Sequence, residues 1–379
     1  LEGEETWVST GDPLMPVRES TILLPQGTEI RSIDVSYPGA SLLVAGSVEL
    51  LATPAAVPFS GPGGKPAGST SFIATSFGGR DAVEFSNHTI RGYNVGTLRI
   101  FPVEYDALAD TLTYHSEISV TVNVARSGSD AAGTARYSEA DRRRVMALVD
   151  NPGAVDDYVP AASTSTGGSV APSLGGGYEY VIVTSRALES GFEPLVSHKR
   201  SRGLSAAIVT TEYIDANYSG TETGDRADRI RSFIADARAH WGTQWVLLGG
   251  DVEVVPKRGV YASVGSTVDT RLPTDMYYAC LDGTWNGDGD NLWAEPNDGD
   301  GGGDVDLLAD VYVGRAPVSD LTETANFVAK TIQYETTAHS HADTAVWLGE
   351  QLDESTWGAY SATAIRDRVI PDDWNLIER

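Results

Sequence analysis

The sequence predicts an α/β protein, a doubly wound parallel sheet preceded by an antiparallel β-sandwich. Three observations lead to this prediction. The first 125 residues contain short runs of alternating polar and apolar residues, which are typical of antiparallel strands. After residue 178, apolar runs alternate with amphipathic helical stretches, which is the pattern of βα units. The apolar run from Trp245 to Leu248 ends in Gly-Gly-Asp, as a strand buried on both faces does before a loop.

Residues 1–125 are predicted to form the β-sandwich. Alternation is clearest from Glu117 to Val124, where one face of the strand is buried and the other is solvated. Such a region is a scaffold and carries no chemistry of its own. The predicted strands are 20–24, 29–37, 42–51, 71–77, 82–85, 97–105 and 112–124.

Residues 126–177 are predicted to be a linker with one short helix at 138–149. Clusters of Ser, Gly, Ala and Thr on either side of the helix bury little apolar surface. The helix contains Arg142, Arg143 and Arg144. Two interpretations stay open: these arginines form a solvated helix face, or Arg144 marks a processing site in an accessible segment.

Residues 178–338 are predicted to form a first α/β subdomain. Its expected strands are 178–184, 206–210, 245–248 and 310–314, and its expected helices are 187–202, 225–240 and 320–336. Asp320 is a suitable N-cap for the last helix, with Glu323 at the capping-box position.

Residues 339–379 are predicted to begin a second, incomplete α/β subdomain, with a fifth strand at 344–349, a helix at 355–369 and a strand at 374–377. Ligands of doubly wound sheets bind beyond the carboxyl ends of the strands. The loops after Leu248, Val313 and Leu348 therefore form the edge expected to carry a site.

Charge and cysteine content exclude several classes of protein. The formal net charge of -26 disfavours nucleic acid and anionic membranes as partners. A single cysteine in 379 residues excludes an intrachain disulfide framework and a multi-thiolate metal site. No apolar run is long enough for a transmembrane helix.

The loop from Asp282 to Asp306 is rich in acidic residues and glycine. Clustered carboxylates repel one another unless a cation neutralises them, and oxygen ligands in a flexible loop suit Ca²⁺. We expect a calcium site there; the alternative is a solvated acidic insertion. The twelve-residue calcium-loop template, started at Thr284 where Asp is preferred, selects four of the five candidate ligands, which are Asp282, Asn286, Asp288, Asp290 and Glu295.

Cys280 has two interpretations. It becomes a candidate nucleophile if a histidine lies close to it in space. However, its neighbours Tyr277 to Leu281 are predicted to form a short apolar strand, in which a cysteine is a small buried hydrophobic residue. The second interpretation is the one we expect.

Three stretches of the second half stand out as an ordered series. They are Val246-Leu247-Leu248-Gly249-Gly250-Asp251, Thr274-Asp275-Met276-Tyr277-Tyr278 and Asp310-Val311-Tyr312-Val313-Gly314-Arg315-Ala316-Pro317. With them, the chain resembles the first half of the catalytic domain of gingipain-type cysteine peptidases. Gly349-Glu350-Gln351-Leu352 is similar to the opening of that family's second subdomain, and Gly11-Asp12-Pro13-Leu14-Met15-Pro16 resembles its propeptide region.

The resemblance implies a caspase-like fold and a calcium-stabilised zymogen at the cell surface or outside the cell. It also implies hydrolysis of protein or peptide substrates by a Cys–His dyad. The family places its histidine in a Gly-His-Gly context, which does not occur here. No catalytic residue is therefore assigned in this chain. The dyad is expected beyond Arg379 or in a second chain, and this chain alone is expected to be inactive.

The ending at Arg379 has two interpretations: a truncated fragment, or the first chain of an enzyme cut after Arg379. If a second chain completes the site, Asp353 and Glu354 are candidates to face a basic substrate side chain. The alternative is that they complement the dipole of the following helix. Two competing functions stay open for the whole protein: a non-catalytic surface or secretion-associated homologue, and a calcium-stabilised β-sandwich adhesin.

Overall fold

The computed structural model describes most of the chain. The described residues are 5–7, 15–39, 41–45, 83–106, 109, 111–127, 139–159, 177–264, 267–290, 292–296, 298, 304–305, 307–337, 339, 341–347, 366, 370 and 374–378. The strand predicted at 71–77 and most of the helix predicted at 355–369 lie outside these residues.

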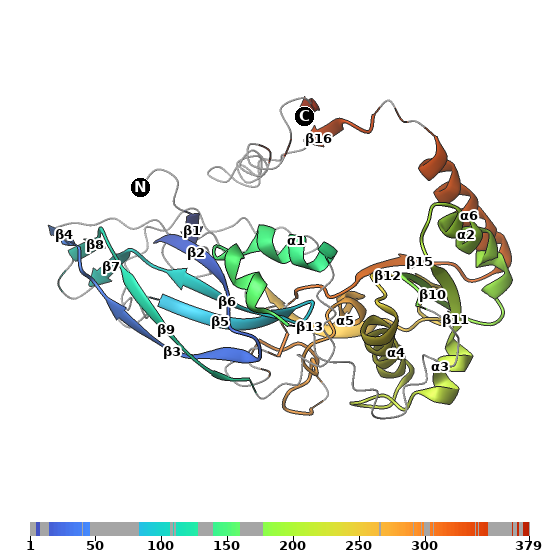
Figure 1. Cartoon of the computed structure of the whole chain (residues 1–379), viewed down its shortest axis with the longest axis horizontal. Coiled ribbons are helices and arrows are strands. Elements are labelled where there is room, and N and C mark those ends of the chain that lie inside the picture. The colour runs from blue at the N-terminus through green and yellow to red at the C-terminus, as the bar shows by residue number, and fades with distance from the viewer. Residues whose placement is uncertain are drawn as a thin grey trace.

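The described N-terminal strands pair antiparallel in three groups (Figure 1). One has the order β1 (Glu5–Trp7), β2 (Met15–Leu23), β6 (Tyr93–Ile100) and β5 (Val83–Ile90). The second pairs β3 (Thr28–Ser36) with β9 (Ser119–Arg126), and the third has the order β4 (Ser41–Ala45), β8 (Thr111–His115) and β7 (Val103–Asp106). Leu24, Ile30, Val83 and Leu98 form a core shared by the first two groups.

Two of the predicted N-terminal strands are each divided in two. The run 97–105 is interrupted at Phe101 and Pro102, between β6 and β7. Proline has no N–H to donate to a neighbouring strand, and its carbonyl accepts from the His115 N–H at 2.9 Å instead. The run 112–124 is interrupted between β8 and β9. Alternation alone does not show where a chain turns from one pairing to the next.

The helix predicted at 138–149 is present as α1 (Glu139–Leu148), followed by the 3-10 helix η2 (Pro152–Asp157). Val145 and Val149 are buried against Leu23, Tyr93 and Val95 of the N-terminal sheet, together with Val155 and Tyr158. The Tyr158 hydroxyl donates to the Leu24 carbonyl at 2.7 Å. This part of the segment therefore belongs to a packed core.

The second half contains the predicted parallel sheet. Its order is β11 (Ala206–Thr210), β10 (Tyr180–Thr184), β12 (Trp245–Gly249) and β15 (Tyr312–Ala316), with all neighbours parallel. Helices α2 (Glu189–Ser201) and α6 (Leu321–Thr336) cover one face, and α3 (Thr211–Asn217) and α4 (Arg226–Trp241) cover the other (Figure 1). The doubly wound fold predicted for this region is confirmed at this level.

Alternate residues of the buried strands supply the two cores. Val181 and Val183 pack with Ile230, Phe233 and Ile234 of α4. Ile182 packs on the other face with Phe192 and Leu195 of α2 and with Val328 of α6. Burial on both faces explains why these strands have continuous apolar runs instead of alternation.

Capping residues set the ends of the helices. The Asp225 carboxylate accepts from the Asp228 N–H at 2.9 Å at the start of α4, and Gly242, with φ 74°, ends it in the left-handed conformation. Asp320 accepts from the Thr322 and Glu323 N–H groups, as predicted. The Glu323 carboxylate accepts from the Ser319 N–H, one residue before the cap.

The predicted secondary structure of the α/β region was wrong at one place and lacked two elements. Tyr277 to Leu281, predicted as a strand, begins with the short helix α5 (Met276–Ala279), because its tyrosines pack into the core beside α4. Helix α3 follows β11 directly, with Thr210 as its cap, and was not predicted. The hairpin of β13 (Arg258–Val264) and β14 (Thr267–Thr274) was also not predicted.

The predicted fifth strand forms but does not extend the parallel sheet. β16 (Thr344–Trp347) pairs in parallel with β17 (Asn375–Glu378), which satisfies its backbone hydrogen bonds on that side, and it lies apart from the four-stranded sheet in Figure 1. Among the described residues, no helix is both long and apolar enough to cross a membrane.

Candidate functional site

The carboxyl edge of the parallel sheet contains a point where the strand order reverses. From β10 the chain moves to β11 on one side, and then crosses to β12 on the other. Ligands of open α/β sheets bind in the crevice at such a point. Here the Thr184 hydroxyl, at the end of β10, donates to the Gly249 carbonyl at the end of β12.

Gly249 and Gly250 leave no room for side chains at this edge. A Cβ on Gly249 would lie 2.8 Å from Cε2 of Phe192, and one on Gly250 would lie 2.4 Å from Cβ of Val254. Both distances are shorter than real carbon contacts. The Gly-Gly sequence is therefore a packing requirement where the strand opens into its loop.

Arg315, near the end of β15, connects the loops at the carboxyl edge of the sheet by hydrogen bonds. Its Nε and Nη2 donate to the two carboxylate oxygens of Asp275 at 2.8 and 2.7 Å. Its Nη1 donates to the carbonyls of Gly250 at 2.9 Å and Val255 at 2.7 Å. The Arg315 side chain therefore joins three of the stretches that carried the family resemblance.

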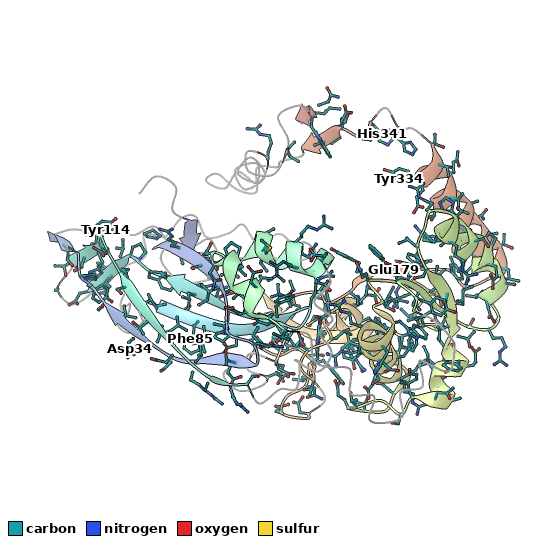
Figure 2. All side chains as sticks on the ribbon, in the orientation of Figure 1. Asp34, Phe85, Tyr114, Glu179, Tyr334 and His341 are labelled. Carbon is teal, nitrogen blue, oxygen red and sulfur yellow. The ribbon has the colours of Figure 1, made fainter. Side chains whose placement is uncertain are left out.

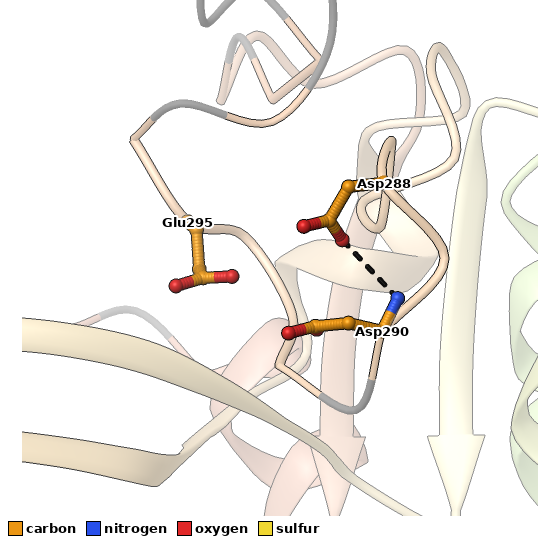
Figure 3. Close-up of side chains that lie close together, drawn as sticks. All are labelled: Asp288, Asp290 and Glu295. Carbon is orange, nitrogen blue, oxygen red and sulfur yellow. Dashed lines mark hydrogen bonds between the residues drawn. The ribbon is translucent and has the colours of Figure 1, made fainter.

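The acidic loop brings three of the five predicted metal ligands together. One carboxylate oxygen from each of Asp288, Asp290 and Glu295 lies within 4.8 Å of the others. Figure 3 shows Glu295 facing the two aspartates across the loop, with Asp288 accepting from the Asp290 N–H at 3.1 Å. We call these three residues the acidic triad.

The other two predicted ligands lie nearby in the chain but make other contacts. The Asn286 side-chain amide donates to the Asp290 carbonyl at 2.9 Å, and its own buried Oδ1 has no hydrogen-bond donor among the described residues. Asp282 is outside the acidic triad, and its carbonyl accepts from Arg231 at 2.8 Å. Thr284, the first position of the template, hydrogen-bonds to Asp304 and so closes the base of the loop.

The carboxylates of this loop lie close together, and burial together with their mutual repulsion makes it harder for Glu295 and Asp298 to lose their protons. Burial, with the neighbouring charges of Asp290, Asp298 and Asp288, raises the pKa of Glu295. Burial also raises the pKa of Asp298, and Asp288, Asp304 and Asp290 add to the effect. The loop therefore concentrates negative charge that a cation would neutralise.

Three aromatic residues, Tyr277, Trp285 and Trp293, hold the acidic loop against the α/β region. This role was not predicted from the sequence. The Arg258 guanidinium of β13 lies 4.4 Å from the Tyr277 ring centroid and 3.9 Å from that of Trp293. Trp285 is buried edge-to-face against Tyr277 at 5.7 Å. The sequence did contain a signal for this packing, namely two tryptophans, Trp285 and Trp293, inside a polar loop. A tryptophan in such a loop is usually packed against a core.

Cys280 is fully buried, as expected for a small core residue. It belongs to the core formed by α4 and the sheet, and its carbonyl accepts from the Arg231 guanidinium at 3.1 Å. A thiol in this position cannot be reached by a peptide substrate. The structure thus gives no support to a nucleophilic role for Cys280.

The remaining predicted site residues are only partly described. Asp353, Glu354 and Arg379 lie outside the described residues, so their predicted roles stay predictions. Arg144 is described, and its Nη1 donates to the Tyr312 hydroxyl at 2.6 Å. This contact involves the arginine in packing between α1 and β15; cleavage after it stays a prediction.

The fold and its carboxyl edge define a doubly wound α/β protein with a switch point between β10 and β12, a class that includes many enzymes. The family model described as Peptidase family C25 matches residues 173–377, which is more than half of the chain. The chain therefore belongs to this family, the gingipain family, and the resemblance seen in the sequence is confirmed. No curated protein matches the chain.

Solved structures that resemble the chain do so in part. A gingipain K structure from Porphyromonas gingivalis, described in terms of zymogenic latency, is 22% identical with a TM-score of 0.26, covering 33% of this chain and 71% of that one. A complex of RgpB pro- and mature domains from the same organism is 16% identical with a TM-score of 0.34, covering 53% and 41%. A structure described as a protease is 15% identical with a TM-score of 0.37, covering 53% of this chain. The chain spans 39% of the length of that protease.

Proposed function

We propose that this chain is part of a secreted, gingipain-like cysteine endopeptidase made as a zymogen. The observation that supports this most is the family match over residues 173–377, which includes the whole four-stranded sheet and its carboxyl edge. Its substrates would be proteins or peptides. The strongly negative formal charge of -26 argues against nucleic acid as a partner. Family membership also supports a location outside the cell or on its surface.

The reactive thiol would come from outside this sequence. Cys280 is the single cysteine of the 379 residues, and it is buried. Cysteine peptidases attack with an accessible thiolate and use a histidine as general base. We therefore propose that both groups lie C-terminal to Arg379 or in a second chain, and that this chain alone is inactive.

We expect the complete protein to hydrolyse fluorogenic peptides with Arg or Lys before the cleaved bond, in the presence of Ca²⁺ and a reductant. The Cys280→Ala variant should keep its kcat/KM within about twofold of the parent, because a buried thiol takes no part in the reaction. Complete loss of turnover in a folded Cys280→Ala protein would overturn the assignment of the thiol. Absence of turnover in the parent would favour the non-catalytic homologue.

The acidic loop would bind Ca²⁺. Asp288, Asp290 and Glu295 offer carboxylate oxygens within 4.8 Å of one another, and the unsatisfied Asn286 Oδ1 lies in the same loop. Hard oxygen donors of this kind fit calcium, which takes six to eight of them. Bound calcium would neutralise the charge of the loop and hold it against β13 and α5.

In metal-free protein, stability should decrease as pH rises through the titration of Glu295 and Asp298. Their pKa values are raised in the folded chain, so the folded state binds more protons than the unfolded state between the ordinary and raised pKa values. Calcium should remove this trend and raise stability at pH 7 by about 2.7 kcal/mol at a hundred times its Kd. Thermal unfolding with and without chelator, from pH 4 to 8, measures both effects.

A charge-matched pair of variants separates a calcium site from a general charge effect. Asp290→Asn should abolish the thermal shift on adding Ca²⁺, whereas Glu253→Gln, at an exposed position outside the acidic triad, should keep it. An equal response in both variants, or no calorimetric heat with the parent protein, would show that the loop is a solvated insertion.

A further inference from the structure

Two histidines lie close together directly after α6. The ring centroids of His339 and His341 are 5.1 Å apart, and the ring planes are inclined at 45° to each other. The Ala342 N–H donates to the His339 carbonyl at 3.3 Å, and the Thr344 N–H donates to the His341 carbonyl at 3.0 Å. These hydrogen bonds fold the connection into turns before β16 begins. The backbone therefore brings the two imidazole rings together, and we call them the histidine pair.

The last turn of α6 holds the first ring of the histidine pair in place. The His339 ring stacks on the Tyr334 ring, with centroids 4.3 Å apart and an angle of 24° between the planes. The Nε2 atom of His339 lies 2.9 Å from the Tyr334 carbonyl oxygen. Two contacts with one residue therefore fix both the position and the rotation of the His339 ring.

The contact with the carbonyl determines which nitrogen of His339 can coordinate a metal ion. A carbonyl oxygen only accepts hydrogen bonds, so Nε2 is the N–H donor. In a neutral imidazole the lone pair is then on Nδ1. Metal-binding histidines almost always donate their other ring N–H to a carboxylate, a backbone carbonyl or water, which orients the ring and raises its basicity. His339 has this arrangement.

The separation of the two rings fits a shared metal ion. Two imidazoles that bind one tetrahedral ion with metal–nitrogen distances of about 2.0–2.1 Å have ring centroids roughly 5 Å apart. The observed separation is 5.1 Å. His341 is exposed, so its ring can rotate to bind an ion that is held by Nδ1 of His339.

Imidazole nitrogens select the class of metal. They suit Zn²⁺, Cu²⁺ and Ni²⁺, whereas Ca²⁺ takes oxygen ligands. The histidine pair is therefore chemically distinct from the acidic triad, whose ligands are carboxylates. The formal net charge of -26 raises the concentration of cations near the surface of the chain. Water would complete the coordination shell, because two protein ligands leave positions open.

The histidine pair lies where the chain leaves the first α/β subdomain. α6 ends at Thr336, and β16 begins at Thr344. Figure 2 shows Tyr334 near the end of α6 and His341 on the segment that leads to β16. Tyr334 is 61% exposed, so an ion in solution can reach this place. An ion bound to both histidines would connect the end of α6 to the turn before β16.

We infer that His339 and His341 form a surface site for a divalent transition metal, namely Zn²⁺, Cu²⁺ or Ni²⁺, and that the bound ion stiffens the connection between α6 and β16. His339 supplies Nδ1, and His341 supplies a second imidazole nitrogen. Tyr334 is a positioning residue, because it orients His339 through its ring and its carbonyl. The site is separate from the proposed calcium site and does not depend on peptidase activity.

Calorimetry with ZnCl₂ tests this inference in the complete protein. Excess Ca²⁺ would occupy the acidic triad, and the reactive thiol would first be blocked with iodoacetamide, so that neither contributes to the zinc signal. The parent should bind Zn²⁺ at a site that His339→Ala and His341→Ala each weaken at least about tenfold.

His240→Ala is the matched control, because the His240 side chain is also at the surface, 49% exposed, and is paired with Asp236 at 2.7 Å. This variant should leave the zinc affinity unchanged. Absence of zinc binding in the parent, or equal zinc affinities in the parent, His339→Ala and His341→Ala, would overturn the inference.

Pulsed EPR with Cu²⁺ counts the coordinated imidazole rings directly. One equivalent of Cu²⁺ should couple to two imidazoles in the parent and in His240→Ala, and to one in His341→Ala. The same coupling in the parent and in His341→Ala would place the ion elsewhere and overturn the inference.

Hydrogen exchange tests the stiffening of the connection. The backbone amides of Ala342 and Thr344 donate within the turns, so they should exchange at least about threefold more slowly in zinc-loaded protein than in metal-free protein. His341→Ala should not show this difference. Exchange of these amides that is unchanged by zinc in the parent would overturn the stiffening.

Discussion

Replacing Phe192 by alanine should lower the free energy of unfolding of the α/β region by about 3–5 kcal/mol, the usual cost of truncating a buried aromatic residue. Phe192 is 0% exposed, between α2 and the sheet. Its ring fills the space above Gly249, where a Cβ would lie 2.8 Å from Cε2. Urea unfolding followed by tryptophan fluorescence measures the loss.

Phe85→Ala is the matched control, because this phenylalanine on β5 is 38% exposed. Its replacement should cost less than about 1 kcal/mol. Gly249→Ala alone should cost about 1–3 kcal/mol through overpacking, and less in the Phe192→Ala background, where the new methyl group occupies the emptied space. Strictly additive effects would contradict the contact between these two positions.

Replacing Arg315 by leucine should destabilise the loops of the carboxyl edge by about 2–4 kcal/mol. The substitution removes the hydrogen bonds that Arg315 donates to Asp275 and to the carbonyls of Gly250 and Val255. Hydrogen exchange of the backbone amides of residues 249–255 should accelerate more than that of the amides in α4. Such a difference would show that the effect is local to the carboxyl edge.

Arg315→Lys distinguishes geometry from charge. Lysine keeps the positive charge but lacks the planar fork that serves Asp275 and the two carbonyls together, so we expect an intermediate loss of stability. If Arg315→Leu and Arg315→Lys both unfold at the same urea concentration as the parent, the loops are held by other contacts.

The parallel sheet was predictable because the local sequence pattern of each strand indicates a buried strand. Tyr180 to Val183 and Trp245 to Leu248 are apolar runs, and the helix α4 between them has clear caps at Asp225 and Gly242. Such signals need no knowledge of distant residues. For a given strand order, right-handed crossovers then fix which face of the sheet each helix covers. The order β11-β10-β12-β15 itself is known from the structure.

Elements defined by distant contacts were not predictable in this way. Tyr277 and Tyr278 have the composition of a strand, yet form a turn of helix because their rings pack beside α4 and against Trp285. β16 has the pattern of a fifth strand but pairs with β17. In each case tertiary partners decide the outcome, and a short apolar run is compatible with either structure.

The candidate site was predictable in composition but not in geometry. The acidic loop stood out from its residues, and three of its five predicted ligands come together at Asp288, Asp290 and Glu295. Its anchoring by Arg258 between Tyr277 and Trp293 depends on the unpredicted hairpin. The charge contact between Arg91 and Asp141 likewise joins residues fifty positions apart, and no local pattern indicates it.

The central claim is that the reactive thiol of the complete protein lies outside this sequence. Labelling of the reactive cysteine tests that claim most directly. The complete protein would be treated with a thiol-reactive peptide inhibitor that has Arg or Lys next to its reactive group, and the modified residue mapped by mass spectrometry. We predict a single labelled cysteine outside the 379 residues of this sequence, with Cys280 unmodified until the protein is unfolded. Stoichiometric labelling of Cys280 in the folded protein, with loss of turnover, would contradict the proposal that this chain supplies the framework of the site and another segment supplies its thiol.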